Sequence, residues 1–189
     1  MTRPLRHTYQ LKVSLLGIRP PIWRRILVAD LTTLTELHNV IQIVMGWTNS
    51  HLYQFIARGR RYGEHDPDYD ELDKDLLDAG RIRVASVLRT EKSMIKYEYD
   101  FGDGWVHDIT LEKKLGFDPE RELPICVTGR RGCPPEDVGG VVGYRNFLKI
   151  YHNELHPEHR EMLDWAGDYY HPENFDIEEV NEILYETFQ

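Results

Sequence analysis

Apolar and polar residues alternate near the start of the chain. Over 8–16 every second position is apolar, which is the pattern of a strand with one buried face. The apolar positions are Tyr9, Leu11, Val13 and Leu15. Residues 17–21 contain a glycine and two prolines, and because proline cannot donate to a β-ladder they predict a turn. Residues 22–28 are again rich in apolar side chains and predict a second strand, antiparallel to the first.

A helical period follows this predicted hairpin. Thr33 and Glu36 have the spacing of a capping box, in which a hydroxyl and a carboxylate each bind a free backbone N–H at the start of a helix. Apolar residues then recur at intervals of three and four, on one helical face. They are Leu37, Val40, Ile41, Val44 and Met45. Gly46 predicts the end of the helix, because glycine readily adopts the left-handed C-cap conformation.

Four later segments have the composition of strands. His51–Ala57 predicts a third strand and Leu123–Val127 predicts the last one. Lys96–Phe101 and Trp105–Glu112 flank a Gly-Asp-Gly sequence. Aromatic and β-branched residues on both sides of an Asp-Gly pair predict a β-hairpin.

The remaining segments predict a loop and then helices. Glu64–Asp78 is acidic and poor in apolar residues, so we expect a surface loop with one helical turn at most, whereas 81–88 fits a short helix and a strand equally well. Two later apolar groups have helical spacing: Tyr144, Phe147, Leu148 and Tyr151, then Met162, Leu163 and Trp165. A last helix is expected to begin at a capping box of Asp176 and Glu179. It should bury Val180, Ile183, Leu184 and Phe188.

This order of elements predicts an α+β fold with a mixed or antiparallel sheet and C-terminal helices. Its start, strand, strand, helix and strand, is similar to that of a β-grasp fold. The 189 residues, 41% of them hydrophobic, are enough for one ordinary core, so we expect a single domain over 1–189 and no disordered protein.

Charge is unevenly distributed along the chain. Residues 1–61 contain nine Lys or Arg and two Asp or Glu, whereas 62–189 contain fourteen and thirty, for a net charge of −9 overall. The acidity argues against general nucleic-acid binding. A basic face in the N-terminal third could still contact DNA, and opposite charges at two ends of one domain could favour self-association. The candidate basic residues are Arg24, Arg25, Arg58, Arg60 and Arg61.

The sequence also bears on location. No apolar run approaches the roughly 20 residues of a membrane span, so we expect no membrane association. No apolar stretch follows the charged residues 1–7, so no secretory signal is expected. Cys126 and Cys133 are too few for a disulfide-dense scaffold, which favours a cytoplasmic protein.

The predicted hairpin concentrates side chains that could bind a ligand: Asp100, Asp103, Trp105 and His107. A two-residue turn at 103–104 would place Asp100 opposite His107, where the carboxylate could orient the imidazole. A three-residue loop would instead place Tyr99 opposite His107 and Phe101 opposite Trp105. The structural alternative is a tight turn whose aspartate binds backbone N–H groups while the aromatic rings pack in the core.

A long loop over 126–144 is rich in glycine and proline, and loops of this length are usually functional or disordered. The Pro-Pro and Gly-Gly pairs favour a fixed path that could present Arg130, Glu136 and Asp137 to a ligand. Cys126 and Cys133 are weak metal-ligand candidates, since their spacing is not that of a usual zinc site and two more ligands would be needed. No cofactor is required by the sequence, and a divalent metal is an open possibility.

Several other features favour structural roles. The carboxylates of Asp66, Asp68 and Asp70 resemble part of a calcium loop, but Glu71 and Leu77 replace its glycine and its last glutamate. His38 and His51 are interpreted as hydrogen-bonded structural histidines. The indoles of Trp23, Trp47 and Trp105 are expected to anchor the core.

Five blocks of the sequence together resemble the plasmid pRiA4b ORF-3-like family. They are Pro20-Pro21-Ile22-Trp23-Arg24-Arg25, Leu37-His38-x-Val40-Ile41-Gln42, Met45-Gly46-Trp47-x-x-Ser50-His51-Leu52-Tyr53-x-Phe55, Tyr99-Asp100-Phe101-Gly102-Asp103-Gly104-Trp105-x-His107 and Pro134-Pro135-Glu136-Asp137-x-Gly139-Gly140, with Phe175-Asp176 also fitting. The resemblance implies a single α+β domain from a plasmid or transposable element, carried as a passenger. Some family members are labelled as resolvase-associated. The chain has neither the arginine-rich serine site nor the basic helix-turn-helix of a serine resolvase. Val138 stands where many members have a cysteine.

Two functions remain open from the sequence. One is a ligand- or partner-binding accessory module without catalysis, which recognises its target through the hairpin tip and the Pro/Gly loop. The other is a metal-assisted hydrolase or phosphoryl-transfer enzyme, in which carboxylates hold the ion, His107 acts as base and Arg130 neutralises an anion.

Overall fold

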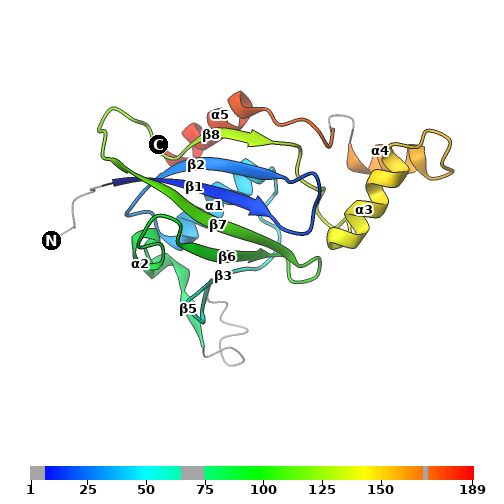
Figure 1. Cartoon of the computed structure of the whole chain (residues 1–189). Coiled ribbons are helices and arrows are strands. Elements are labelled where there is room, and N and C mark those ends of the chain that lie inside the picture. Colours follow the sequence, from blue (N-terminus) through cyan, green and yellow to red (C-terminus); the bar gives the residue numbers. More distant parts are fainter. Residues whose placement is uncertain (1–6, 65–74, 168–169) are drawn as a thin grey trace.

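One mixed sheet of eight strands forms the centre of the molecule (Figure 1). The computed structural model describes residues 7–64, 75–167 and 170–189. The strand order is β5-β4-β3-β6-β7-β1-β2-β8, and all neighbours are antiparallel except β4 and β5. The strands are β1 (His7–Leu15), β2 (Trp23–Ala29), β3 (Tyr53–Ala57), β4 (Arg60–Gly63), β5 (Leu76–Asp78), β6 (Met94–Tyr99), β7 (Trp105–Gly116) and β8 (Ile125–Arg130).

Helices pack against one face of this sheet and extend past its end. They are α1 (Leu34–Met45), a 3-10 turn η1 (Ala79–Arg81), α2 (Val84–Val87), α3 (Gly140–Tyr151), α4 (His159–Ala166) and α5 (Ile177–Phe188). Figure 1 shows α1 and α5 behind the sheet, while α3 and α4 project beyond it. The α+β class, the mostly antiparallel sheet and the C-terminal helices are therefore confirmed, as is the opening order of strand, strand, helix and strand.

The alternating pattern near the N-terminus forms the predicted strand, β1, with one buried face. Tyr9, Leu11, Val13 and Leu15 are buried in the core, and the residues between Leu11 and Leu15 on the other face are half-buried. Helix α1 covers the apolar face of the sheet. Its predicted capping box is present, with Glu36 N donating to the Thr33 hydroxyl and Thr33 N donating to the Glu36 carboxylate. Gly46 ends the helix with a φ of 85°.

The acidic segment departs from its prediction where it can be described. Leu76–Asp78 is a strand, paired in parallel with β4, because its backbone completes the edge of the sheet. Residues 65–74 lie outside the described residues, and with them the carboxylates of the calcium-like loop. The ambiguous segment 81–88 contains the short helix α2.

Two predictions about apolar packing are wrong. Helix α5 begins as expected, with the Asp176 carboxylate accepting from two backbone N–H groups of the first turn, and it buries Leu184. Ile183, however, is 42% exposed, because the helix packs through only part of its apolar face. Trp23 is half-buried on the outer face of β2, where Lys12 and Arg25 lie over its ring.

One of the five arginines predicted to form the basic face is buried instead. Arg24 is 1% exposed, and its guanidinium donates to the carbonyls of Val44, Trp23 and Arg130 while stacking on Phe175. Burial lowers its pKa from the ordinary value. Arg24 therefore ties α1, β2, β8 and the C-terminal segment together and cannot contact DNA. Within the described residues, none of the helices has the length and apolar character needed to cross a membrane.

Candidate functional site: a junction of three loops

Three segments that are distant in sequence meet at the end of the β6–β7 hairpin. They are 46–52, which follows α1, the hairpin tip 99–104, and the Pro/Gly loop 132–140, and we call this region the three-loop junction. In Figure 1 the hairpin turn lies beside the start of α3, which follows the third segment. The contacts between the segments are made by polar side chains, so each is described in turn.

The hairpin register differs from both predicted alternatives. Tyr97 pairs with His107 and Tyr99 pairs with Trp105, so residues 100–104 form a five-residue connection. The predicted pairing of Asp100 with His107 is therefore wrong, and so is that of Tyr99 with His107. The longer loop forms because Asp100 adopts a left-handed φ of 56° and leaves the β-ladder.

Asp100 is the organising residue of the hairpin tip. Its Oδ1 accepts hydrogen bonds from Gly102 N at 2.9 Å and Asp103 N at 3.3 Å, and its carbonyl accepts from Gly104 N. Its backbone N–H donates to the carbonyl of Leu52 at 2.9 Å. The carboxylate thus caps the turn, as the structural alternative predicted, and the Asp100 residue is buried at the edge of the junction.

Glu136 joins the Pro/Gly loop to the other two segments. Its Oε1 accepts from the hydroxyl of Tyr99 at 2.5 Å, and its Oε2 accepts from the backbone N–H and the hydroxyl of Thr48 at 3.1 and 2.5 Å. Trp47 adds a second link, since its indole N–H donates to the carbonyl of Pro134 at 3.0 Å. Burial and the hydrogen bond to Glu136 raise the pKa of Tyr99, so the phenol stays protonated and keeps donating.

The Gly-Gly pair permits the closest approach within the junction. Gly139 N donates to Asp103 Oδ2 at 3.1 Å. Gly140 has a φ of 65°, and a Cβ atom built on it would lie 2.2 Å from the carbonyl oxygen of Asp103. Only glycine fits there without a shift of backbone, which accounts for the sequence of the loop.

His51 lies between two carboxylates from the other segments. Its Nδ1 is 3.8 Å from Asp100 Oδ1, and its Nε2 is 3.3 Å from Asp137 Oδ1. One potential ligand atom from each of these three residues lies within 4.8 Å of the other two, the arrangement of a possible cation site. Asp137, like Asp100, has a left-handed φ, here 59°.

His107 and Trp105 lie inside the core and not at the junction surface. Both are 0% exposed, and neither ring nitrogen of His107 nor the indole nitrogen of Trp105 has a hydrogen-bond partner within the described residues. Burial lowers the pKa of His107 to about 3, although the nearby carbonyls of Tyr97 and Trp105 offset part of the effect. His107 therefore has no access to a substrate at the junction surface, and its burial gives no support to the predicted role as a base.

A second histidine, His38, is buried and has both ring nitrogens in hydrogen bonds. Its Nδ1 is 2.8 Å from the Tyr97 hydroxyl and its Nε2 is 2.6 Å from Asn49 Oδ1. The amide of Gln42 donates to the same hydroxyl at 2.8 Å and accepts from Asn49 N. Burial lowers the pKa of His38 to about 4. The predicted structural role of His38 is confirmed.

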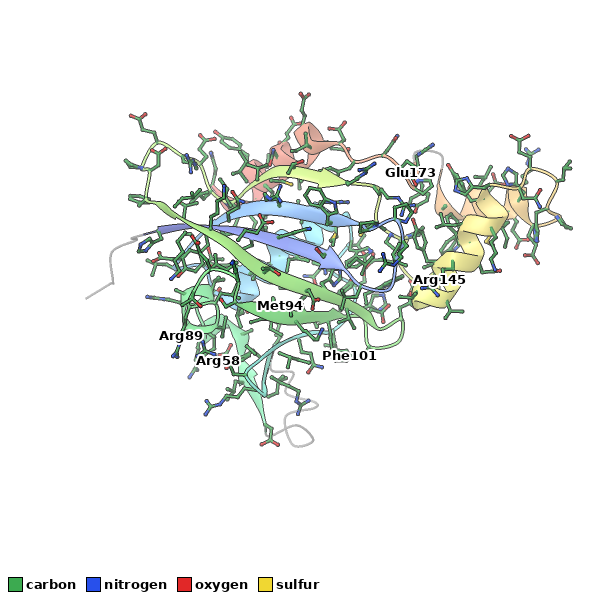
Figure 2. The ribbon with its side chains drawn as sticks, viewed as in Figure 1. Arg58, Arg89, Met94, Phe101, Arg145 and Glu173 are labelled. Carbon is green, nitrogen blue, oxygen red and sulfur yellow. The ribbon has the colours of Figure 1, made fainter. Side chains whose placement is uncertain are left out.

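The remaining predicted ligands, Arg130 and the two cysteines, do not line the surface of the junction. Arg130 is exposed at the end of β8, and its neighbour Arg131 is the buried arginine of the loop, paired with Glu173 (Figure 2) at 2.7 Å and donating to the carbonyl of Pro20. Cys126 and Cys133 are free and buried. Burial raises the pKa of their thiols to about 11 and about 12, so both are protonated at neutral pH in the absence of a metal ion.

The sequence prediction thus identified four junction residues and missed three. Asp100, Asp103, Glu136 and Asp137 come together, whereas Arg130, Trp105 and His107 do not join them. His51, Thr48 and Tyr99 were missed. One sequence signal was available for them. Residues 47–52 connect a helix to a strand and contain four consecutive polar or ionisable side chains, Thr48, Asn49, Ser50 and His51.

Comparison with known proteins identifies the same family as the five sequence blocks described above. The family model for plasmid pRiA4b ORF-3-like proteins matches residues 7–179. The uncharacterized protein y4hQ of Sinorhizobium fredii is 39% identical over 160 residues, which cover 84% of this chain and 80% of that protein. The crystal structure of MM3350, a protein of unknown function from Methanosarcina mazei Go1, superposes with a TM-score of 0.83 at 34% identity, over 93% of this chain and 98% of that one. The chain therefore belongs to the plasmid pRiA4b ORF-3-like family.

Proposed function

We propose that the protein is an accessory binding module that takes a cationic ligand at the three-loop junction, without catalysis. The observation that carries the proposal is the charge of the junction. Its three segments contain four carboxylates and no lysine or arginine. The Asp137 side chain is 73% exposed, so a ligand from solvent can reach this charge. Complementary charge both steers a cationic partner and fixes its orientation.

Two exposed apolar side chains lie beside these carboxylates. Leu52 is 50% exposed and is tied by its carbonyl to Asp100 N. Phe101, which Figure 2 labels near the hairpin tip, is 55% exposed. An apolar contact next to an acidic centre suits a partner segment that presents a lysine or arginine next to an apolar residue. The surface is held in place from below by the hydrogen bonds of Glu136, which reduces the ordering needed on binding.

The hydrolase alternative receives no comparable support. It assigned a base to His107 and an anion-binding guanidinium to Arg130. His107 is buried with a pKa of about 3, and Arg131 rather than Arg130 enters the loop interior. The relatives named above carry no assigned activity in their descriptions.

Two further expectations belong to this proposal. The core residues run from β1 to α5 in one cluster, which supports treating 1–189 as a single domain. Both thiols are free and buried, which supports a reducing compartment such as the cytoplasm.

Fluorescence anisotropy with labelled peptides tests the proposal. Peptides that pair Arg or Lys with Leu or Phe are compared with the same peptides carrying Glu in place of the base. We expect the wild-type chain to prefer the basic peptides and Asp137→Asn to bind them about fivefold more weakly, the effect of one exposed ion pair. Asp164→Asn, which removes an exposed carboxylate on α4, is the matched control and should bind like wild type. Equal binding of basic and acidic peptides, or an unchanged affinity in Asp137→Asn, would contradict the proposal.

A further inference from the structure

We propose that the junction holds a divalent metal ion, coordinated by His51, Asp100 and Asp137. The inference rests on the proposed function, because it names the ligand of the same acidic junction. It concerns a triad that the sequence analysis did not assemble, since His51 was assigned a structural role there.

The triad brings one ligand from each segment of the junction. His51 follows α1, Asp100 begins the hairpin tip, and Asp137 lies in the Pro/Gly loop. One ligand atom from each residue lies within 4.8 Å of the other two. Within the triad, the separations are 3.3 Å between His51 Nε2 and Asp137 Oδ1 and 3.8 Å between His51 Nδ1 and Asp100 Oδ1. The hairpin tip and the Pro/Gly loop are already fastened to each other through Asp103 and Gly139.

The geometry between His51 Nε2 and Asp137 Oδ1 fits two ligands of one ion better than it fits a hydrogen bond. Nε2 of His51 is buried at the atomic level and makes no hydrogen bond, although Asp137 Oδ1 is only 3.3 Å away. An N–H bond on Nε2 would therefore not point at this oxygen closely enough to form a hydrogen bond. Two ligand atoms about 2.0–2.1 Å from one tetrahedral zinc ion are about 3.3 Å apart, so the observed separation matches one edge of such a site.

The Asp100 carboxylate is oriented before any ion arrives. Its Oδ1 is held by the backbone N–H groups of Gly102 and Asp103, and the side chain is 9% exposed. A carboxylate fixed in this way loses little conformational entropy when it binds an ion. With a neutral imidazole the triad carries a charge of −2, which a divalent cation neutralises.

The ligand types restrict the choice of ion. Calcium and magnesium prefer oxygen ligands throughout, whereas an imidazole with two carboxylates suits zinc or manganese. Three protein ligands leave further coordination positions open to solvent or to a partner's carboxylate. The ion would then complete the binding surface beside Phe101.

Isothermal titration calorimetry with each metal chloride alone tests the inference. The full chain, prepared without a histidine tag and treated with chelator, is titrated with zinc, manganese, magnesium and calcium. We expect one zinc or manganese ion per chain and weaker magnesium and calcium binding. His51→Gln and Asp137→Asn should each weaken zinc binding by at least about tenfold, since even the loss of an outer-shell partner weakens metal binding by about that much.

Asp164→Asn is again the matched control and should bind zinc like wild type. Asp100→Asn is left out because its carboxylate also caps the turn, and circular dichroism confirms that the two triad variants fold. Zinc binding that is unchanged in both variants, or absent in the wild type, would overturn the metal site.

The two proposals fail in different ways. Absence of metal binding together with binding of basic peptides that depends on Asp137 would overturn the metal site alone. Metal binding that depends on the triad, without any preference for basic peptides, would support the metal site and overturn recognition of a basic partner segment.

Discussion

The β6–β7 hairpin contributes to two polar clusters, one around the Tyr97 hydroxyl inside the core and one around the Asp100 carboxylate at the tip. Inside the core, both ring nitrogens of His38 and both amide atoms of Gln42 are hydrogen-bonded, to the phenol or to Asn49, so the fold itself uses these buried polar groups. At the tip, Asp100 uses one oxygen for the turn, and His51 and Asp137 lie beside it without a hydrogen bond between them. The same strands thus supply a structural network and, a few residues away, polar groups that remain available.

Trp47 packs against both strands of the same hairpin and binds the Pro/Gly loop. Its ring stacks on Tyr99 at 5.0 Å between centroids and meets His107 edge-on at 5.4 Å, and its N–H binds the Pro/Gly loop. The comparison therefore predicts that changes inside the core alter stability, whereas changes at the junction rim alter binding. The following experiments are ordered from the largest expected effect on stability to the smallest.

Acidification should cause the largest loss of stability, because it acts on two buried histidines, His38 and His107. The unfolded chain protonates its histidines near pH 6.5, whereas the folded chain keeps His38 neutral to about pH 4 and His107 to about pH 3. The stability is therefore complete above pH 6.5 and falls as the pH decreases from there. Between pH 7 and pH 5 we expect a loss of about 2 kcal/mol for each of the two histidines.

Urea denaturation at a series of pH values measures this loss. His107→Phe keeps an aromatic ring in the core and removes one of the titrating groups, so its pH dependence should be about half as steep. An equally steep dependence in His107→Phe would show that His107 is accessible to protons in the folded state.

Gly140→Ala should destabilise the junction by about 3 kcal/mol. The substitution adds a left-handed residue and places a methyl group against the carbonyl of Asp103. Gly104→Ala is the control, because Gly104 has a similar φ of 68° but nothing within 4 Å of the added carbon, and it should cost only about 1 kcal/mol. Equal losses in thermal or urea denaturation would mean that the two loops do not touch as described.

Tyr97→Phe should cost about 2 kcal/mol, because it leaves His38 Nδ1 and the Gln42 amide buried without their partner. Tyr53→Phe removes a hydroxyl whose bond to Thr35 is long, at 3.3 Å, and should cost less than about 1 kcal/mol. Comparison of the two free energies of unfolding separates the network from a general effect of losing a phenol. Similar values for both would contradict the network.

Glu136→Gln should have the smallest effect on stability, about 1 kcal/mol. The amide keeps one acceptor oxygen but cannot accept both the Tyr99 hydroxyl and the two Thr48 donors. Hydrogen exchange at the amide of Thr48 should quicken while exchange in α1 stays unchanged. Quickened exchange throughout α1 would show that the junction is part of the core rather than its rim.

The sequence predicted what depends on local periodicity and on backbone chemistry. The alternation in β1, the capping box at Thr33 and the Asp-Gly hairpin all report local preferences, and each is confirmed. The register of the hairpin was not predictable, because it depends on Asp100 leaving the ladder to bind Gly102 and Asp103. Burial of Arg24 was likewise hidden, since its partners are carbonyls of Val44 and Arg130, which no side-chain pattern reveals.

The candidate site was only partly predictable for the same reason. The carboxylates of the hairpin and of the Pro/Gly loop were visible as polar residues next to turns, but their meeting with His51 depends on the packing of Trp47 against Tyr99 and on the missing side chain of Gly140. Arg131 rather than Arg130 points inward because of a left-handed φ of 68° at that residue, which composition does not indicate.

Paramagnetic broadening of backbone amide signals by manganese most directly tests whether the junction, rather than the buried cluster, is where the protein binds. In wild type the strongest broadening should be centred on residues 49–52, 100–104 and 136–139, and Asp137→Asn should abolish it at the same manganese concentration. Broadening centred on the acidic helix α5, or an identical pattern in Asp137→Asn, would contradict the account.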